Sequence, residues 1–308
     1  MRALPALFAT VLACACGPAG LAPPELTAPA GLDPAVVELL ERRLTEVRAR
    51  PAAAEAHAAL GLALEANDLW REAEQSLANA ARLAPAEPHW RYHRALALAA
   101  LGEAAAALEL LRAVAAELPQ APYVAQRLGE AALAAGALDE ARAAFERTCQ
   151  LAPERTEGFA GLGATELAAG RTREALSALE RAVGLDPSYK NAHYRLGLAY
   201  REGGRLAEAE RELALGVQGR VRFLPDPYSE ELRKNAVAST ARFLHAMTLL
   251  ESERPERAAR ILESLLVAQP EDVTVLNNLA IALQRSGQLE AARARLEEAA
   301  ALAPEVLS

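Results

Sequence analysis

Residues 122–155 read PYVAQRLGEAALAAGALDEARAAFERTCQLAPER and decide the fold, because the same pattern recurs along most of the chain. Its proline recurs with a spacing of 34 residues, at Pro51, Pro85, Pro119, Pro153 and Pro187, and again at Pro270 and Pro304. Alignment on this period predicts units that start at Ala54, Pro88, Pro122, Thr156, Lys190, Ser239 and Val273. A fixed period of this length is typical of proteins built from stacked copies of one supersecondary unit.

Four positions of the unit carry the pattern of two antiparallel helices joined by a turn. Position 8 is glycine or alanine in every copy, position 20 is always alanine, and position 24 is always leucine or phenylalanine. Small side chains allow two helices to approach closely where they cross. Position 15 is usually glycine, which accepts the left-handed conformation that ends a helix, and Asp68 and Glu253 replace it in two copies.

This pattern resembles the tetratricopeptide repeat (TPR), a helix-turn-helix unit. The resemblance covers residues 54–216 as repeats 1–5 and residues 239–308 as repeats 6–7. It implies an all-α fold, an α-α superhelix (TPR solenoid) of about seven helix-turn-helix repeats with one insertion, in which each unit buries its apolar face against its neighbours. Residues 34–53 are expected to form an N-terminal capping helix, since Asp33 and Pro34 make a typical helix start.

Composition and charge limit the function classes. The 308 residues are 52% hydrophobic but only 4% aromatic, which fits closely packed, alanine-rich helices. The net charge of −8 disfavours nucleic acid, because binding to phosphates needs basic surface. The sequence lacks a phosphate-binding loop, a nucleophile elbow and a zinc-protease motif, and the pair His89 and His93 has no further ligand placed by sequence. We therefore expect no enzyme activity, no cofactor and no metal, and we expect Cys149 to act as a small buried side chain.

The N-terminal residues predict export. Residues 1–16 have the proportions of a signal peptide, and their end, VLACACG, resembles the lipobox of bacterial lipoproteins. The resemblance implies lipidation of Cys16 or Cys14, with cleavage by an ordinary signal peptidase as the alternative. Residues 17–33 read as a flexible tether. The expected location is the bacterial cell envelope, at the outer membrane facing the periplasm, with the lipid anchor as the only membrane contact.

Residues 217–238 interrupt the repeats. Pro225 and Pro227 exclude a helix where they stand, and Asp226 followed by Pro227 favours a new helix start. From Pro227 to about Ser252 nothing breaks a helix, so we expect one helix of about seven turns that extends the first helix of repeat 6. Its extra turns, with Tyr228 and Arg233, must project beyond the stack or lie across the groove. The insertion is either a recognition element or lid, or a spacer between two blocks of repeats.

The resemblance also implies a concave groove lined by fixed positions of each first helix. Those positions hold the candidate partner-binding residues, which are His89, Tyr92, His93, Tyr123, Gln126, Arg127, Asn191, Tyr194, Arg195, Arg201, Phe243, Asn277 and Asn278. Tyrosine and arginine often anchor interfaces, and amides can pair with the backbone of an extended peptide. The alternative is that some tyrosines pack between neighbouring units. The basic clamp with which some TPR co-chaperones hold a C-terminal carboxylate is not matched in any three consecutive units.

Two functional hypotheses follow. The first is a non-enzymatic TPR scaffold or adaptor lipoprotein that binds a protein or peptide partner in the cell envelope through its groove. The second is an accessory subunit of an envelope enzyme or redox complex that docks through residues 217–238, with a small-molecule or glycan binder as a weaker variant.

Overall fold

The structure is a computed structural model that describes residues 21–25 and 32–302 apart from residue 218. Within these residues it consists of 16 α-helices without a strand. A first helix, α1 (Pro34–Ala49), precedes seven helix pairs and one short helix, α12 (Ser229–Asn235). The pairs are α2 (Ala54–Glu65) and α3 (Trp70–Leu83), α4 (Pro88–Ala100) and α5 (Ala104–Glu117), α6 (Pro122–Ala134) and α7 (Leu138–Leu151), α8 (Thr156–Ala168) and α9 (Thr172–Leu185), α10 (Lys190–Glu202) and α11 (Leu206–Leu215), α13 (Ser239–Glu251) and α14 (Pro255–Ala268), and α15 (Val273–Arg285) and α16 (Leu289–Leu302).

The repeat alignment and the all-α solenoid are both confirmed. The first helix of each of the seven pairs starts at the residue that the 34-residue period predicts. Five glycines at position 15 have positive φ angles between 71° and 81°, namely Gly102, Gly136, Gly170, Gly204 and Gly287. Asp68 and Glu253, which replace this glycine, adopt the same conformation with φ of 62° and 55°. The turn geometry is therefore imposed by the stack even where the residue is unsuited to it.

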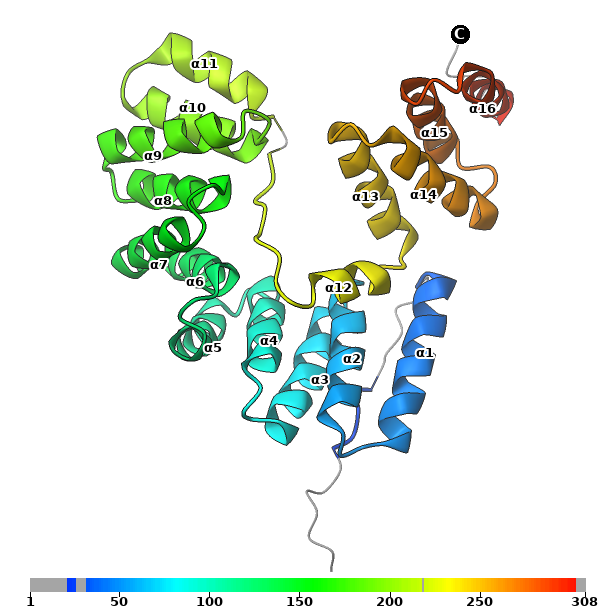
Figure 1. Ribbon diagram of the computed structural model, residues 1–308, viewed down its shortest axis with the longest axis horizontal. Helices are drawn as coiled ribbons and strands as arrows, with labels where there is room; N and C mark the ends of the chain where they lie inside the picture. Colours follow the sequence, from blue (N-terminus) through cyan, green and yellow to red (C-terminus); the bar gives the residue numbers. More distant parts are fainter. Residues whose placement is uncertain (1–20, 26–31, 218, 303–308) are drawn as a thin grey trace, which may run out of the picture.

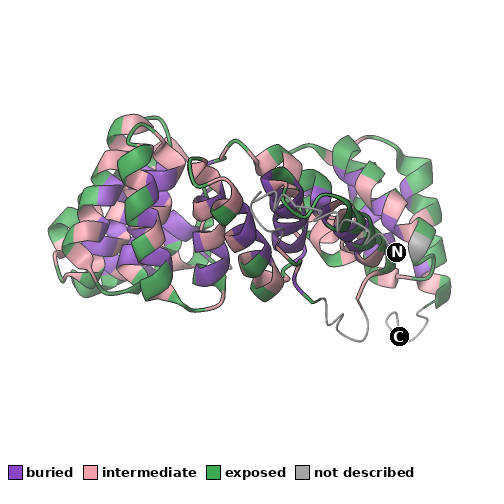
Figure 2. Ribbon diagram, turned by 90° about the horizontal axis from the view of Figure 1, so that it is seen from below, coloured by how far each residue is buried: buried purple, intermediate pink, exposed green. Residues whose placement is uncertain are grey.

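Within a pair, the two helices cross where the small and large positions meet. A Cβ atom added at Gly163 would lie 2.4 Å from Cγ of Leu179, and one added at Gly129 would lie 2.9 Å from the ring of Phe145. These are positions 8 and 24 of the same unit. The alanine of position 20 is at most 5% exposed in all seven units. Buried residues accordingly lie where neighbouring helices face each other, and exposed residues cover the outer surface (Figure 2).

The helix pairs form two arms joined by a non-helical segment and the short helix α12. Helices α2 to α11 follow an arc, and α13 to α16 form the second arm (Figure 1). Between the arms, residues 219–228 contain no helix and run along the inner side of the arc, back towards α2. We call residues 219–228 the strap. The arms also meet at an ion pair between Lys190 and Glu251, whose charged atoms lie 3.4 Å apart.

The prediction of one seven-turn helix from Pro227 to Ser252 is wrong, because residues 236–238 separate α12 from α13. The side chain of Asn67, in the turn after α2, binds the main chain at both ends of this break. Its amide nitrogen donates to the carbonyl of Asn235 at 2.7 Å, and its amide oxygen accepts the N–H of Ala238 at 3.1 Å. Contacts with a distant part of the chain thus bind main-chain groups that a continuous helix would pair internally. The sequence left two positions open for these turns, beyond the stack or across the groove. Helix α12 lies across the inner side of the arc, beside α2.

Residues 21–25, which the sequence assigns to the flexible tether, are hydrogen-bonded to the first repeat. The N–H of Leu21 donates to the carbonyl of Pro51, and the amide of Asn79 donates to the carbonyl of Ala22 at 2.9 Å. Residues 21–25 therefore lie against the first repeat instead of hanging free. Cys14 and Cys16 lie outside the described residues. No helix of the described chain has the length and apolar character needed to cross a membrane.

Candidate functional site

The strap is held on the inner side of the arc by a glutamine that binds its backbone. Gln126 of α6 is 1% exposed. Its amide nitrogen donates to the carbonyl of Arg222, and its amide oxygen accepts the N–H of Leu224, both at 2.7 Å. One side-chain amide thereby satisfies a donor and an acceptor of an extended chain, as a neighbouring β-strand would do. The groove thus binds a peptide backbone, and that backbone belongs to its own chain.

Two residues near the start of α10 bind the beginning of the strap. The hydroxyl of Tyr189 accepts the N–H of Arg222 at 3.0 Å, and the amide of Asn191 donates to the carbonyl of Gly219 at 3.4 Å. A Cβ atom at Gly219 would lie 2.5 Å from the main-chain nitrogen of Asn191, so only glycine allows this approach. Burial raises the pKa of the Tyr189 hydroxyl, which stays neutral and keeps both its donor and its acceptor.

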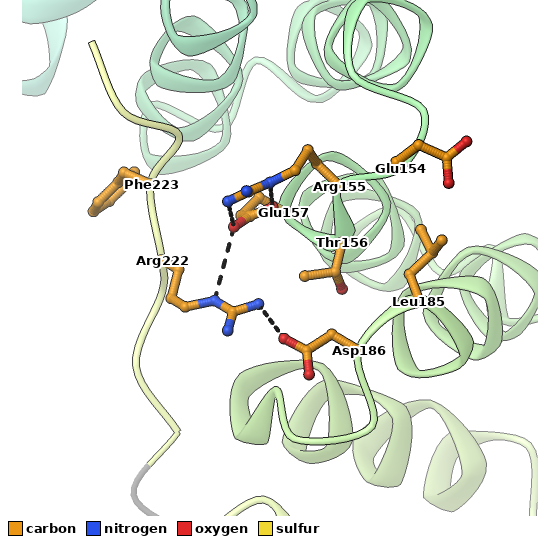
Figure 3. A pocket seen from close by; sticks show the side chains of 8 residues that line it. All are labelled: Glu154, Arg155, Thr156, Glu157, Leu185, Asp186, Arg222 and Phe223. Atoms are coloured by element: carbon orange, nitrogen blue, oxygen red, sulfur yellow. Dashed lines mark hydrogen bonds and ion pairs between the residues drawn. The ribbon is translucent and has the colours of Figure 1, made fainter. Parts of the chain in front are cut away.

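The side chain of Arg222 points to two acidic residues of the repeats. Its guanidinium donates to Asp186 at 2.6 Å and lies 3.8 Å from Glu157, whose other partner is Arg155. Burial alone would raise the pKa of Asp186, but hydrogen bonds from Ser188 and Arg222 outweigh it and hold this pKa below 3.8. These residues line a cavity of about 460 Å³ beside the strap (Figure 3).

The next two strap residues make the apolar contacts. The guanidinium carbon of Arg127 lies 3.2 Å from the ring centre of Phe223, which places the cation over the face of the ring. Leu224 is 6% exposed and is the most deeply buried residue of the strap, whereas Phe223 remains 40% exposed. Burial of Leu224 gives the strap its main apolar anchor.

The end of the strap enters an aromatic cluster. The ring of Tyr228 lies 4.9 Å from that of Trp90 and 5.5 Å from those of His89 and His93. Tyr123 joins the cluster through its hydroxyl, which lies 3.0 Å from Nε2 of His89. Such edge and tilted ring arrangements favour aromatic pairing beyond simple burial. The insertion and the first helices of repeats 2 and 3 are thus brought together here.

A buried histidine lies beneath this cluster, between two carboxylates. His93 is fully buried, its Nδ1 lies 3.0 Å from Glu65, and its Nε2 faces Asp226 of the strap at 4.0 Å. Asp226 itself accepts the N–H of Tyr228 at 2.8 Å, which turns the chain into α12. Among the described residues, no group of three or more His, Cys, Asp or Glu side chains is placed to hold a metal ion.

The structure places the remaining predicted residues apart from the strap. Tyr92 is 1% exposed and packs against Tyr123, as the packing alternative expected. Arg195 donates to the carbonyl of Ala160, and Tyr194 is 46% exposed. Arg201 is exposed at the end of α10, and Arg233 is exposed on α12 and pairs with Glu230. In the second arm, Phe243 packs into that arm's core, Asn277 is exposed, and Asn278 donates to Thr274.

Sequence reasoning missed three residues that hold the strap, Tyr189, Asp186 and Glu157. Tyr189 directly precedes α10 and so lies outside the first-helix positions that line the groove. Asp186 follows the end of α9, and Glu157 lies in the first turn of α8. Glu157 occupies position 2 of repeat 4, the position that His89 and Asn191 hold in repeats 2 and 5, so the repeat pattern could have identified it. Asp186 and Tyr189 lie between helices, where the pattern of first-helix positions gives no signal.

Two family models, both described as tetratricopeptide repeat, match the chain. One matches residues 62–122 and 161–225, and the other matches residues 249–306, which together make up more than half of the 308 residues. A search of curated proteins finds no significant match.

Solved structures of similar shape share little sequence with the chain. MamA from residue 41 to its end, from Desulfovibrio magneticus RS-1, is 18% identical, with a TM-score of 0.45 over 67% of this chain and 99% of that one. YrrB, described as a TPR protein with an unusual peptide-binding site, is 16% identical, with a TM-score of 0.48 over 58% and 92%. TTC0263 from Thermus thermophilus is 23% identical, with a TM-score of 0.40 over 64% and 100%. At these identities no ligand is carried over to this chain.

Proposed function

Because the chain belongs to the tetratricopeptide repeat family, we propose that it is a non-enzymatic scaffold of the bacterial cell envelope that binds a protein or peptide partner in its groove. The family is typically a non-catalytic platform for protein interactions. One observation carries the proposal. Gln126 donates to and accepts from the main chain of an extended segment, with Tyr189 and Asn191 as further backbone partners. Main-chain bonds of this kind supply affinity for peptides of many sequences.

Part of the groove is left for a partner. Tyr194 occupies in repeat 5 the position that Gln126 occupies in repeat 3, and it is 46% exposed. An exposed tyrosine at a binding position is a suitable interface anchor. We therefore assign first contact with a partner to the Tyr194 end of the groove.

Capture from envelope extract tests this function. Purified wild-type protein and Tyr194→Ala are used as baits, and captured proteins are identified by mass spectrometry. We expect a partner that wild type recovers and Tyr194→Ala recovers at least fivefold less. The control is Leu206→Ala, a truncation of an exposed apolar side chain on α11 (68% exposed), which should recover the partner like wild type. Equal recovery by all three proteins refutes the groove assignment.

The anchor is tested separately. We propose lipidation at Cys16 or Cys14, supported by the lipobox-like sequence. Cells that express wild type, Cys14→Ser or Cys16→Ser are fed a labelled fatty acid and fractionated. Wild type should carry the label in the membrane fraction, and one of the two variants should lose it. An unlabelled wild-type protein in the soluble fraction contradicts the anchor.

Under the accessory-subunit hypothesis, a partner could contact only the outward side of the insertion. Leu224 and the main-chain groups of Arg222 and Leu224 are already bound to the chain's own repeats. Arg233 and Lys234 on α12 are its exposed outward residues. Changing both to Ala should leave capture unchanged if the groove binds the partner, and should abolish capture if the insertion docks on it.

A further inference from the structure

The strap has the contacts of a ligand more than those of a core segment. It is extended, and side chains of the repeats bind its backbone at Gly219, Arg222 and Leu224. Leu224 and the side chain of Asp226 are buried, while Phe223 is 40% exposed and the side chain of Arg222 is 44% exposed. A segment held by polar contacts and few buried apolar ones opens locally at a lower free energy than the helices around it.

The groove also has hydrogen-bonding capacity that the strap does not use. Three buried atoms of side chains that contact the strap find no hydrogen-bond partner among the described residues, and these are Nε2 of His93, Nε of Arg127 and Oδ1 of Asn191. The parent side chains of His93 and Asn191 are 0% and 7% exposed. A buried polar atom without a partner costs free energy that a better-fitting occupant recovers. The fit between strap and groove is therefore incomplete at its beginning, middle and end.

We propose that residues 219–228 are a displaceable internal ligand, and that the external ligand of the groove is an extended peptide segment with the strap's chemistry. This inference rests on the proposed function and specifies its partner. The segment carries, in order, a basic residue, an aromatic residue, an aliphatic residue and, two positions further, an acidic residue. In the strap these are Arg222, Phe223, Leu224 and Asp226.

Each feature of this pattern has a counterpart in the repeats. The basic residue meets Asp186 and Glu157, and the aromatic ring lies against Arg127. The aliphatic residue takes the buried place of Leu224, with its N–H on Gln126. The acidic residue faces His93.

Because the strap is part of the same chain, it competes with any external ligand for the groove. Because short segments join the strap covalently to α11 and α12, its effective concentration at its own site is roughly millimolar. An external segment of equal intrinsic affinity therefore binds the intact protein weakly, and a segment that also satisfies the unpaired atoms binds better. The strap thus sets a threshold that excludes weak, nonspecific peptides.

The test uses a fluorescent peptide with the sequence of residues 219–230, GRVRFLPDPYSE, and fluorescence anisotropy. It is titrated with wild type and with a full-length variant in which residues 220–226 are replaced by a Gly/Ser linker of equal length. We expect the variant to bind at least tenfold more tightly than wild type. Adding Gln126→Ala to the linker variant should weaken binding at least tenfold, whereas adding Gln284→Ala, an exposed amide of α15, should not change it. A peptide of scrambled sequence should not bind the linker variant.

Failure to fold is distinguished from failure of the proposal. The linker variant must keep the helical circular dichroism of wild type, and the wild-type protein provides a second arm that needs no substitution. Hydrogen exchange of the Leu224 and Arg222 amides should be slowed in free wild type and at least fivefold faster with excess peptide. A folded linker variant that binds the scrambled peptide equally well, or exchange that the peptide leaves unchanged, overturns the displaceable-ligand proposal. Capture that depends on Tyr194 would still support the proposed function in that case.

Discussion

The carboxylate of Asp33 accepts both the N–H and the hydroxyl of Ser239, at 2.9 and 2.6 Å, although 206 residues separate them. The same side chain accepts the N–H of Ala35 and so caps α1. One residue before the first helix therefore also holds the start of α13, the first helix of the second arm. The carboxylate suits both helix starts, because their free N–H groups favour negative charge.

Replacing Asp33 should weaken both helix starts. Burial would raise its pKa, but the hydrogen bonds from Ser239 and Ala35 and the charge of Arg242 outweigh this and hold the pKa below 3.8. The stability from the ionised carboxylate is present above the ordinary pKa near 3.8 and is lost as the pH falls through the lowered value. At pH 7 we expect Asp33→Ala to lower the free energy of unfolding by about 1–2 kcal/mol. The control is Asp272→Ala, which removes a cap that binds only its own helix, α15. Denaturant unfolding and hydrogen exchange of α13 measure the effect, and a loss confined to α1 would contradict the bridging role.

Phe223 and Leu224 should differ in how much they contribute to holding the strap on the repeats. Leu224→Ala removes a buried side chain and should lower the local opening free energy by about 2–3 kcal/mol. Phe223→Ala removes a half-exposed ring and its contact with Arg127, for which we expect about 0.5–1 kcal/mol. Native-state hydrogen exchange of the Arg222 amide measures both values, with Leu215→Ala of α11 as an exposed-leucine control. The reverse order would show that the cation–ring contact is the main anchor.

Glu253→Gly should stabilise the protein. Glu253 has a φ of 55°, a conformation that costs a residue with a Cβ atom about 1 kcal/mol and glycine much less. Five of the seven repeats already have glycine at this position. We expect a gain of about 0.5–1 kcal/mol in denaturant unfolding. The reverse change is Gly136→Ala, at the same position of repeat 3. It should lower the free energy of unfolding by a similar amount. If Glu253→Gly is destabilising instead, the left-handed turn is not under strain.

Cys149 should react slowly with alkylating reagents. It is partly buried, and burial together with the charge of Glu146 raises the pKa of its thiol to about 12. Since the thiolate is the reactive form, the rate constant should rise about tenfold per pH unit without levelling off below about pH 10. The measurement uses a variant with Cys14→Ser and Cys16→Ser, so that Cys149 is the only thiol. A plateau near pH 9 would indicate an ordinary exposed thiol.

The candidate site could be predicted from the sequence only in part. Repeat positions identify Gln126, Arg127 and Asn191 as groove residues, because the period fixes which side of each first helix they occupy. The same rule misassigns Tyr92, which is buried against its neighbours, and it overlooks Tyr189, which precedes α10. Whether a groove position binds a ligand or packs inside depends on the size of side chains in the next repeat, which a single-unit pattern does not contain.

By itself, the sequence determined the helices of the repeats, their turns and their stacking order. These features follow from local periodicity, since small residues at positions 8 and 20 and a turn residue at position 15 act within one unit or on its neighbour. The tertiary structure alone decided the course of residues 219–238. Local propensity favours a continuous helix from residue 227 onward, but Asn67 and Asp33 bind the main chain near residues 235–239 from far away in sequence, and Gln126 binds the strap. Such long-range hydrogen bonds become available only after the arc has formed, so no local pattern records them.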